Sequence, residues 1–180
     1  AEEFNIPLTR EQYLTLIGRN VQGSDRQLLS FFPELDVNRY RARMNAIKTA
    51  INERDGIPLK PGVEAMLDYL EAEGIERVVA TSTARTRAEQ ILSEHGILHR
   101  FAGLACGDEV RHSKPHPEIF LKALAITGAE ANHALVFEDS YQGLQAATRA
   151  GIPAIMIPDL LPPSPHYPAT HTVADLHEAI

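Results

Sequence analysis

Residues 134–152 read ALVFEDSYQGLQAATRAGI, and they are the most informative part of the sequence for the fold class. It opens with a short apolar run that ends in two adjacent acids, Glu138 and Asp139. The rest has the pattern of a helix that stops at Gly151, because glycine tolerates the left-handed backbone of a helix end. A short apolar strand followed directly by a helix is the repeating unit of a parallel sheet.

The same alternation extends along the chain on both sides of this stretch. Further apolar runs are RVVATS (77–82), GLACGDEV (103–110) and PAIMIP (153–158). Four short runs separated by helical segments predict an α/β fold, a Rossmann-like parallel sheet covered on both faces. The Pro-rich segment LLPPSPHYP (160–168) predicts a surface loop, and TVADLHEAI (172–180) predicts a closing helix.

The first 56 residues carry a different pattern and are predicted to form a small helical module. Thr9 and Gln12 have the spacing of a capping box at a helix start, and Ser24 and Gln27 repeat that spacing. Helices whose apolar faces must be buried pack against each other, so these segments are expected to form one unit.

A long amphipathic helix is predicted between Asp36 and Asp55. Its apolar residues recur at helical intervals and are expected to form the core of the module: Tyr40, Met44, Ile47 and Ile51. The prolines and glycine of IPLKPGV then break the pattern. We therefore predict two domains, a helical domain at 1–56 and an α/β core at 57–180.

Composition excludes several classes of protein. The 180 residues include 17 Lys and Arg against 24 Asp and Glu, a formal charge of −7 that disfavours nucleic acid. The single cysteine, Cys106, cannot form an internal disulfide and is expected to be a small core residue. No apolar run approaches the roughly 18 residues of a membrane span. We expect a soluble, cytoplasmic protein with no membrane partner, monomeric by default.

The carboxyl ends of the predicted strands carry polar side chains that are expected to meet at one edge of the sheet. Thr81 and Ser82 end the first strand, where a hydroxyl and backbone N–H groups can receive a phosphate oxygen. An ordinary helix cap by these hydroxyls is an equally good interpretation. Lys114, just before a proline-started helix, can hold an anion or stabilise developing charge, although a solvated surface lysine is the simpler reading of that residue alone.

Glu138 and Asp139 lie side by side at the end of a buried strand. Adjacent carboxylates repel each other there, and a hard cation such as Mg²⁺ relieves that repulsion. The alternative is that Asp139 or Ser140 caps the following helix, which leaves Glu138 unexplained. A hydroxyl, a lysine and an acidic pair on successive strands predict Mg²⁺-assisted phosphoryl transfer.

Three segments resemble motifs of the haloacid dehalogenase superfamily. They are VVATS (78–82), SKPHPEIF (113–120) and LVFEDSYQGLQAATRAGI (135–152), similar to the branch with phosphoglycolate phosphatase-like enzymes and beta-phosphoglucomutase. The resemblance covers nearly the whole chain, with the helical module in the place of that branch's cap domain. It implies phosphate ester hydrolysis of a small phosphorylated metabolite through an aspartyl-phosphate intermediate.

The resemblance also implies a role for each matching residue. Thr81 would bind the transferring phosphoryl group, with backbone help from Ser82. Lys114 would stabilise the nucleophile and the phosphoryl oxygens, and Glu138 and Asp139 would hold Mg²⁺ directly or through water.

The superfamily's first motif, an apolar strand ending in Asp-x-Asp-Gly, has no counterpart in this sequence. That motif supplies the nucleophilic aspartate and lies on the central strand of the sheet. We therefore expect these 180 residues alone to be a truncated enzyme that is inactive, with two unpaired inner strand edges.

Two alternative functions stay open at this point. A sugar phosphomutase would need a cap arginine near Val21 to hold a second phosphate, and Arg19 and Arg26 are the nearest arginines. A non-catalytic binding module would explain the missing nucleophile. His112 and His116 have a spacing of four, but the prolines between and after them interrupt the helix that such metal ligands would need, so we do not expect a metal there.

Overall fold

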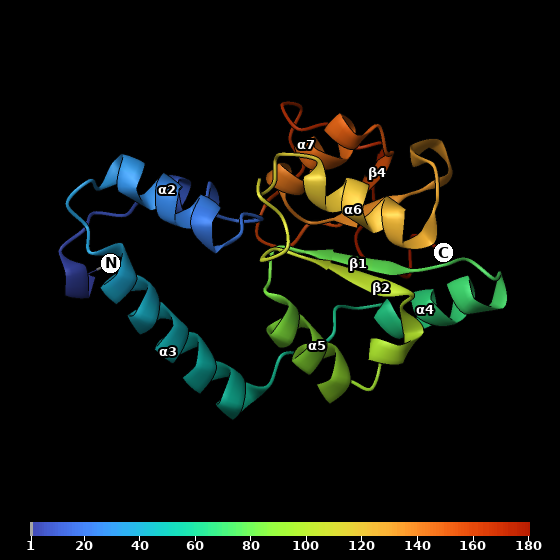
Figure 1. The fold of residues 1–180 in the computed structure, drawn as a ribbon, viewed down its shortest axis with the longest axis horizontal. Coiled ribbons are helices and arrows are strands. Elements are labelled where there is room, and N and C mark those ends of the chain that lie inside the picture. Colours follow the sequence, from blue (N-terminus) through green and yellow to red (C-terminus); the bar gives the residue numbers. More distant parts are fainter. Residues whose placement is uncertain (1) are drawn as a thin grey trace.

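The computed structural model describes residues 2–180 (Figure 1). Its helices are α1 (Arg10–Leu14), α2 (Val21–Phe31), α3 (Val37–Asp55), α4 (Val63–Ala72), α5 (Arg85–Glu94), α6 (Glu118–Thr127) and α7 (Tyr141–Ala150). Its strands are β1 (Val78–Thr81), β2 (Gly103–Cys106), β3 (Val136–Glu138), β4 (Ala154–Met156) and β5 (His171–Thr172). Short 3-10 helices span Glu2–Phe4, Leu98–Arg100 and Ala131–His133. None of the described helices is both long and apolar enough to cross a membrane.

All strand pairs are parallel, which confirms the α/β class. The strands form two groups: β1 pairs with β2, and β4 lies between β3 and β5. Helix α6 packs on one side of β1 and β2, and α5 lies on the other (Figure 1). Within the described chain, β1 and β3 each have one partner strand, so each has one open edge.

The main core lies where α6 and α7 meet β4. Ile119 and Phe120 of α6, Leu144 of α7 and Met156 of β4 are all at most 4% exposed. Helix α7 buries residues three and four positions apart, as the periodicity of its sequence predicts. Cys106 is fully buried on β2, as expected of a core residue, and burial raises the pKa of its thiol.

The start of the helical module confirms one predicted cap and corrects another. Thr9 and Gln12 make both hydrogen bonds of a capping box at the start of α1. The prediction that Ser24 starts the next helix is wrong, because Asn20 caps α2 by accepting from the Gly23 N–H at 2.9 Å. The Asn20 amide also donates to the Gly107 carbonyl in the α/β core, a long-range contact that a local pattern does not reveal.

The apolar stripe of the long helix α3 is not buried as predicted. Tyr40 is 8% exposed and contacts the ring of Phe4 edge-on, whereas Ile47 and Ile51 are 37% and 45% exposed. Figure 1 shows the second half of α3 running beside no other helix of the described chain. Periodicity correctly gives the face of the helix, but it does not say whether another element covers it.

The predicted closing helix at 172–180 is also wrong. Residues 171–172 instead form β5, which extends the sheet beyond β4. The Thr170 N–H donates to the Ala154 carbonyl at 2.7 Å and the Val173 N–H donates to the Met156 carbonyl at 3.1 Å. These pairings use the backbone groups that a helix would need. The domain boundary after residue 56 stays a prediction; α3 ends there at Gly56, which has φ 72°.

Candidate active site

A cavity of about 530 Å³ lies at the carboxyl ends of β1 and β3. Five residues predicted to form the core of the site line it together: Thr81, Ser82, Lys114, Glu138 and Asp139. The helical module contributes Ile17 and Gly18 to the same wall. Polar side chains from separate loops thus converge where parallel strands end, as in other open α/β sheets.

Lys114 and Glu138 form a buried ion pair at the base of this cavity. The residues are 5% and 8% exposed, and the Lys114 ammonium donates to Glu138 Oε1. The same ammonium lies 3.4 Å from the Ala80 carbonyl of β1. One lysine therefore bridges the ends of two strand groups that do not pair with each other. The reading of Lys114 as a solvated surface residue is wrong.

Glu138 is held by donors on both of its oxygens. Its Oε2 accepts from the Asp139 and Ser140 N–H groups, both at 3.1 Å, and from the Ser140 hydroxyl at 2.8 Å. Ser140 also caps α7 by accepting from the Gly143 N–H at 3.1 Å, so the capping alternative describes Ser140 correctly. A side chain at Gly143 would collide with the Glu138 carboxyl group, which explains a glycine in the first turn of this helix.

Asp139 is the less satisfied acid of the pair. Burial raises its pKa, and the negative charge of Glu138 raises it further. Asp159 lines the same cavity and acts in the same direction. Carboxylate oxygens in a cavity with mutual repulsion fit a hard divalent cation, and Mg²⁺ prefers oxygen ligands of this kind. Asp139 is the acid with free ligand capacity, whereas Glu138 already has four donors.

The hydroxyl groups of Thr81, the last residue of β1, and of Ser82 after it both take part in hydrogen bonds. The Thr81 hydroxyl oxygen accepts from the Thr83 N–H at 3.1 Å, which leaves its own hydrogen free to donate. The Ser82 hydroxyl donates to the Gly18 carbonyl at 2.6 Å and so joins the helical module to the core. Both residues line the cavity, so the local turn of Thr81 and a phosphate contact are compatible.

Sequence reasoning did not identify two charged residues at this cavity. Lys60 Nζ and Asp159 Oδ1 form an ion pair of 2.6 Å, and both residues belong to the lining. The position of Asp159 shortly after β4 could have identified it, because the residues after β4 lie at the same edge of the sheet as the acids after β3. Lys60 precedes α4 in a turn, and no local pattern singles it out.

Arg19 and Arg26 lie elsewhere. They line a second cavity of about 400 Å³ and are not in the lining of the first. Their predicted contact with substrate therefore has no support from the geometry of the cavity that contains Thr81 and Lys114.

Comparison with known proteins agrees with this arrangement. Residues 1–157 match the family model for haloacid dehalogenase-like hydrolases. The chain belongs to this family. Its match covers both the helical module and the strand ends that carry the site, and it confirms the superfamily that the three motifs resemble.

Two curated proteins illustrate how this haloacid dehalogenase-like chain compares with its relatives in sequence. It is 30% identical over 153 residues to Protein CbbY, plasmid, of Cupriavidus necator, which covers 77% of this chain and 60% of that protein. It is 36% identical over 95 residues to the phosphorylated carbohydrates phosphatase of Thermotoga maritima, covering 53% of this chain and 44% of that one. The chain thus spans less than two thirds of the length of either relative.

The fold is shared with the crystal structure of CbbY from Rhodobacter sphaeroides in complex with phosphate. The TM-score is 0.79 at 24% identity, and the match covers 97% of this chain and 81% of that one. At this identity the similarity shows the fold alone.

Proposed function

We propose that this chain carries the phosphate- and metal-binding part of a Mg²⁺-dependent phosphatase that acts on a small phosphorylated metabolite. The observation that supports it most is the convergence of Thr81, Lys114 and Asp139 on one cavity of about 530 Å³. The Thr81 hydroxyl would donate to a phosphoryl oxygen, and Mg²⁺ held by Asp139 would neutralise phosphoryl charge. The name of the Thermotoga relative supports a sugar phosphate as the class of substrate.

The covalent step needs a carboxylate nucleophile, which we propose is not among these residues. In such a step the carboxylate attacks phosphorus, the phosphate ester bond breaks, and the leaving alcohol takes a proton; water then hydrolyses the aspartyl phosphate. The sequence contains no Asp-x-Asp pair. Lys114 would hold the anionic oxygens of such a carboxylate and of the phosphoryl group, because its ammonium lies between β1 and β3.

Hydrolysis is favoured over phosphomutase chemistry by what the helical module presents to the cavity. That module contributes the apolar Ile17 and Gly18, whereas Arg19 and Arg26 line the other cavity. A mutase needs a cation there to hold a second phosphate. The alternative to an enzyme is a binding module that has no catalytic activity.

The experiment is to measure Mg²⁺ and phosphate binding and turnover on one preparation whose intact mass is 19.9 kDa. We expect phosphate binding that Mg²⁺ strengthens and that Asp139→Asn and Thr81→Val weaken, with no phosphate release from sugar phosphates. Turnover by this preparation would refute the proposal that the nucleophile is not among these residues. Phosphate binding that is indifferent to Mg²⁺ and to both substitutions would refute the site itself.

A further inference from the structure

A second cavity of about 400 Å³ lies between the helical module and the α/β core. Helix α2 and the residues before it form one side, and the loop 111–117 with the end of α7 forms the other. Its polar lining includes Arg19, Arg26, Arg149, Ser113, His112 and His116. The lining found within residues 2–180 contains no carboxylate, although the chain as a whole carries a charge of −7.

The three arginines of this cavity bind backbone carbonyls and no acid. Arg19 Nε donates to the Thr15 carbonyl at 2.9 Å, and Arg149 Nη1 donates to the Pro115 carbonyl at 2.7 Å. Arg26 Nε lies 3.5 Å from the carbonyl of Gln22, one helical turn earlier. No ion pair of these arginines occurs among the described residues.

Some other arginines of this chain are neutralised by acids, as two arginines of the α/β core show. Arg85 binds Glu89 and Glu109, and Arg100 binds Asp68 and Glu71. A guanidinium has five N–H donors, so each arginine of the second cavity keeps most of its hydrogen-bonding capacity. Burial lowers the pKa of Arg19, and the positive charge of Arg26 adds to the effect, as expected of cations that share a space without a counterion.

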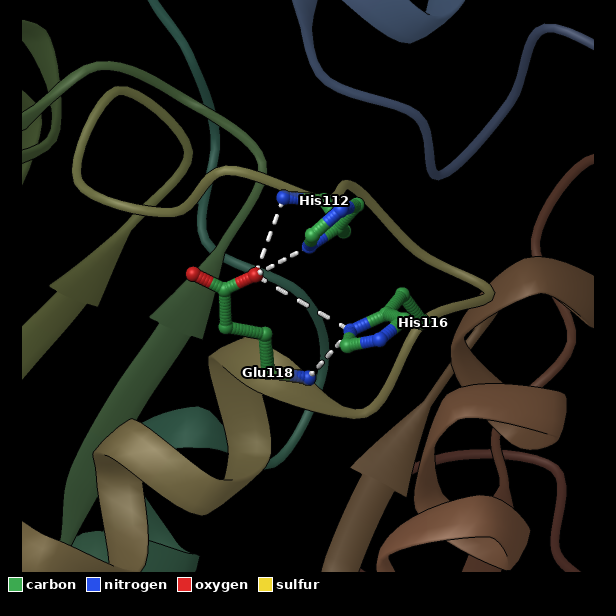
Figure 2. A group of neighbouring side chains, drawn as sticks. All are labelled: His112, His116 and Glu118. Atoms are coloured by element: carbon green, nitrogen blue, oxygen red, sulfur yellow. Dashed lines mark hydrogen bonds and ion pairs between the residues drawn. The ribbon is translucent and has the colours of Figure 1, made fainter.

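A metal ion is the competing ligand, because His112 and His116, which line this cavity, lie together with Glu118 (Figure 2). Glu118 Oε2 lies 3.0 Å from His112 Nδ1 and 3.9 Å from His116 Nδ1, so the turn brings both imidazoles to one carboxylate without a helix. However, the Glu118 carboxylate already accepts from the N–H groups of Arg111 and His112, at 2.8 and 3.0 Å. Three unneutralised guanidinium groups on the adjoining cavity repel a cation and attract an anion.

We propose that this second cavity binds a small oxyanion, either free phosphate or the phosphate group of an organic ester. Arg19 and Arg26 of the helical module and Arg149 of α7 would bind its oxygens, with the Ser113 hydroxyl as a further donor. Guanidinium groups suit this ligand because their parallel N–H groups match the geometry of phosphate oxygens. This site is separate from the proposed active site, since the two cavities share no lining residue. A ligand held from both sides would stabilise the observed contact between module and core.

Arginine footprinting tests the site directly. The 180-residue protein is modified with phenylglyoxal in sodium phosphate or in sodium chloride of equal ionic strength, and modified arginines are identified by peptide mass spectrometry. We expect phosphate to slow modification of Arg19, Arg26 and Arg149 severalfold, and to leave exposed Arg10 unchanged. Arg26→Gln and Arg149→Gln should each raise about tenfold the phosphate concentration needed to protect the remaining two arginines, because each removes a charged hydrogen-bond donor. Arg10→Gln, which removes the same charge outside the cavity, should not.

Two further comparisons distinguish free phosphate from a phosphate ester as the ligand, and the second cavity from the first as the place where it binds. Protection by inorganic phosphate identifies a free anion, and protection by glucose 6-phosphate alone identifies an ester; either supports the proposal. Thr81→Val weakens only the first cavity, so it should leave the protection intact whether or not the proposed phosphatase function is correct. No protection by either ligand, protection that survives both arginine substitutions, or protection that Thr81→Val abolishes would each overturn the proposal.

Discussion

Lys114 and Glu138 form an ion pair in which each side chain is only 6% exposed. The pair connects a loop to the end of β3, and the contact of Lys114 with the Ala80 carbonyl extends it to β1. Two buried charges of opposite sign are stable together, whereas either one alone would be buried without compensation. The charge that serves phosphate binding in our proposal therefore also holds the two strand groups in place.

Replacing Lys114 by Met should lower the free energy of unfolding by about 3–5 kcal/mol, because it leaves the buried Glu138 charge without a partner of opposite sign. Urea unfolding followed by circular dichroism measures this loss. Lys60→Met is the matched control, since its ion pair with Asp159 is 59% and 40% exposed and should be worth less than about 1 kcal/mol. Equal losses in the two variants would contradict the importance of the buried pair.

Gly143→Ala should destabilise the protein by about 1–3 kcal/mol, because the new methyl group overlaps the Glu138 carboxyl group. Alanine is otherwise the better helix former by about 1 kcal/mol. The control is Gly23→Ala in α2, where the new methyl group meets the Ser113 hydroxyl, which can rotate away. Thermal unfolding of both variants should show a loss for the first and little change or a gain for the second. A stabilised Gly143→Ala variant would show that Glu138 is free to move.

Asp139→Asn should stabilise the metal-free protein at neutral pH and have no such effect in strong acid. The raised pKa means that the folded state binds the Asp139 proton more tightly than the unfolded state does. The stability that comes from this proton is complete below the ordinary value of 3.8 and is lost as the pH rises through the folded-state pKa. Urea unfolding at a series of pH values measures the difference from wild type. Glu34→Gln, which removes one exposed acid between α2 and α3, is the control for the loss of a surface charge.

The same Asp139→Asn variant tests the cation. Mg²⁺ should raise the unfolding midpoint of the wild-type protein and leave that of Asp139→Asn unchanged, because the substitution removes the ligand with free capacity. Stabilisation by Mg²⁺ that persists in the variant would place the cation elsewhere.

Glu109→Gln should destabilise the protein by about 1–2 kcal/mol at pH 7 and by much less at pH 2. The pKa of Glu109 is lowered from 4.5 to about 2, mainly by the hydrogen bond from Arg85 and also by Lys122 and the Cys106 N–H. Stability from a lowered pKa is present above the unfolded value and is lost as the pH falls toward 2. Chemical unfolding at both pH values measures it, with Glu76→Gln as the exposed control. A loss independent of pH would show that shape matters at this position more than charge.

The sequence predicts the α/β core and its strand ends because both depend on short-range patterns. The apolar run before Glu138 and the helix spacing up to Gly151 suffice to place the acids at the edge of the sheet. The resemblance to a known family then assigns roles to Thr81 and Lys114, and the structure brings both to the same cavity.

The errors all concern contacts between segments that are distant in the sequence. Asn20 replaces Ser24 as the cap of α2 while its amide reaches Gly107, 87 residues away. Residues 171–172 pair with β4 instead of forming a helix. Asp159 reaches the site because β4 ends beside β3, and Ile51 stays exposed because no described helix covers it.

Among the described residues, two hydrogen bonds join the helical module to the core, Ser82 to Gly18 at 2.6 Å and Asn20 to Gly107 at 2.9 Å. They involve a hydroxyl, an amide and two carbonyls. None of these groups titrates between pH 4 and 10. Each can exchange its partner for water at a net cost of only about 0.5–1.5 kcal/mol. The polar part of this attachment is therefore weak and insensitive to pH, so the apolar packing of Leu14 and Ile17 against the core carries the rest of the contact at any acidity.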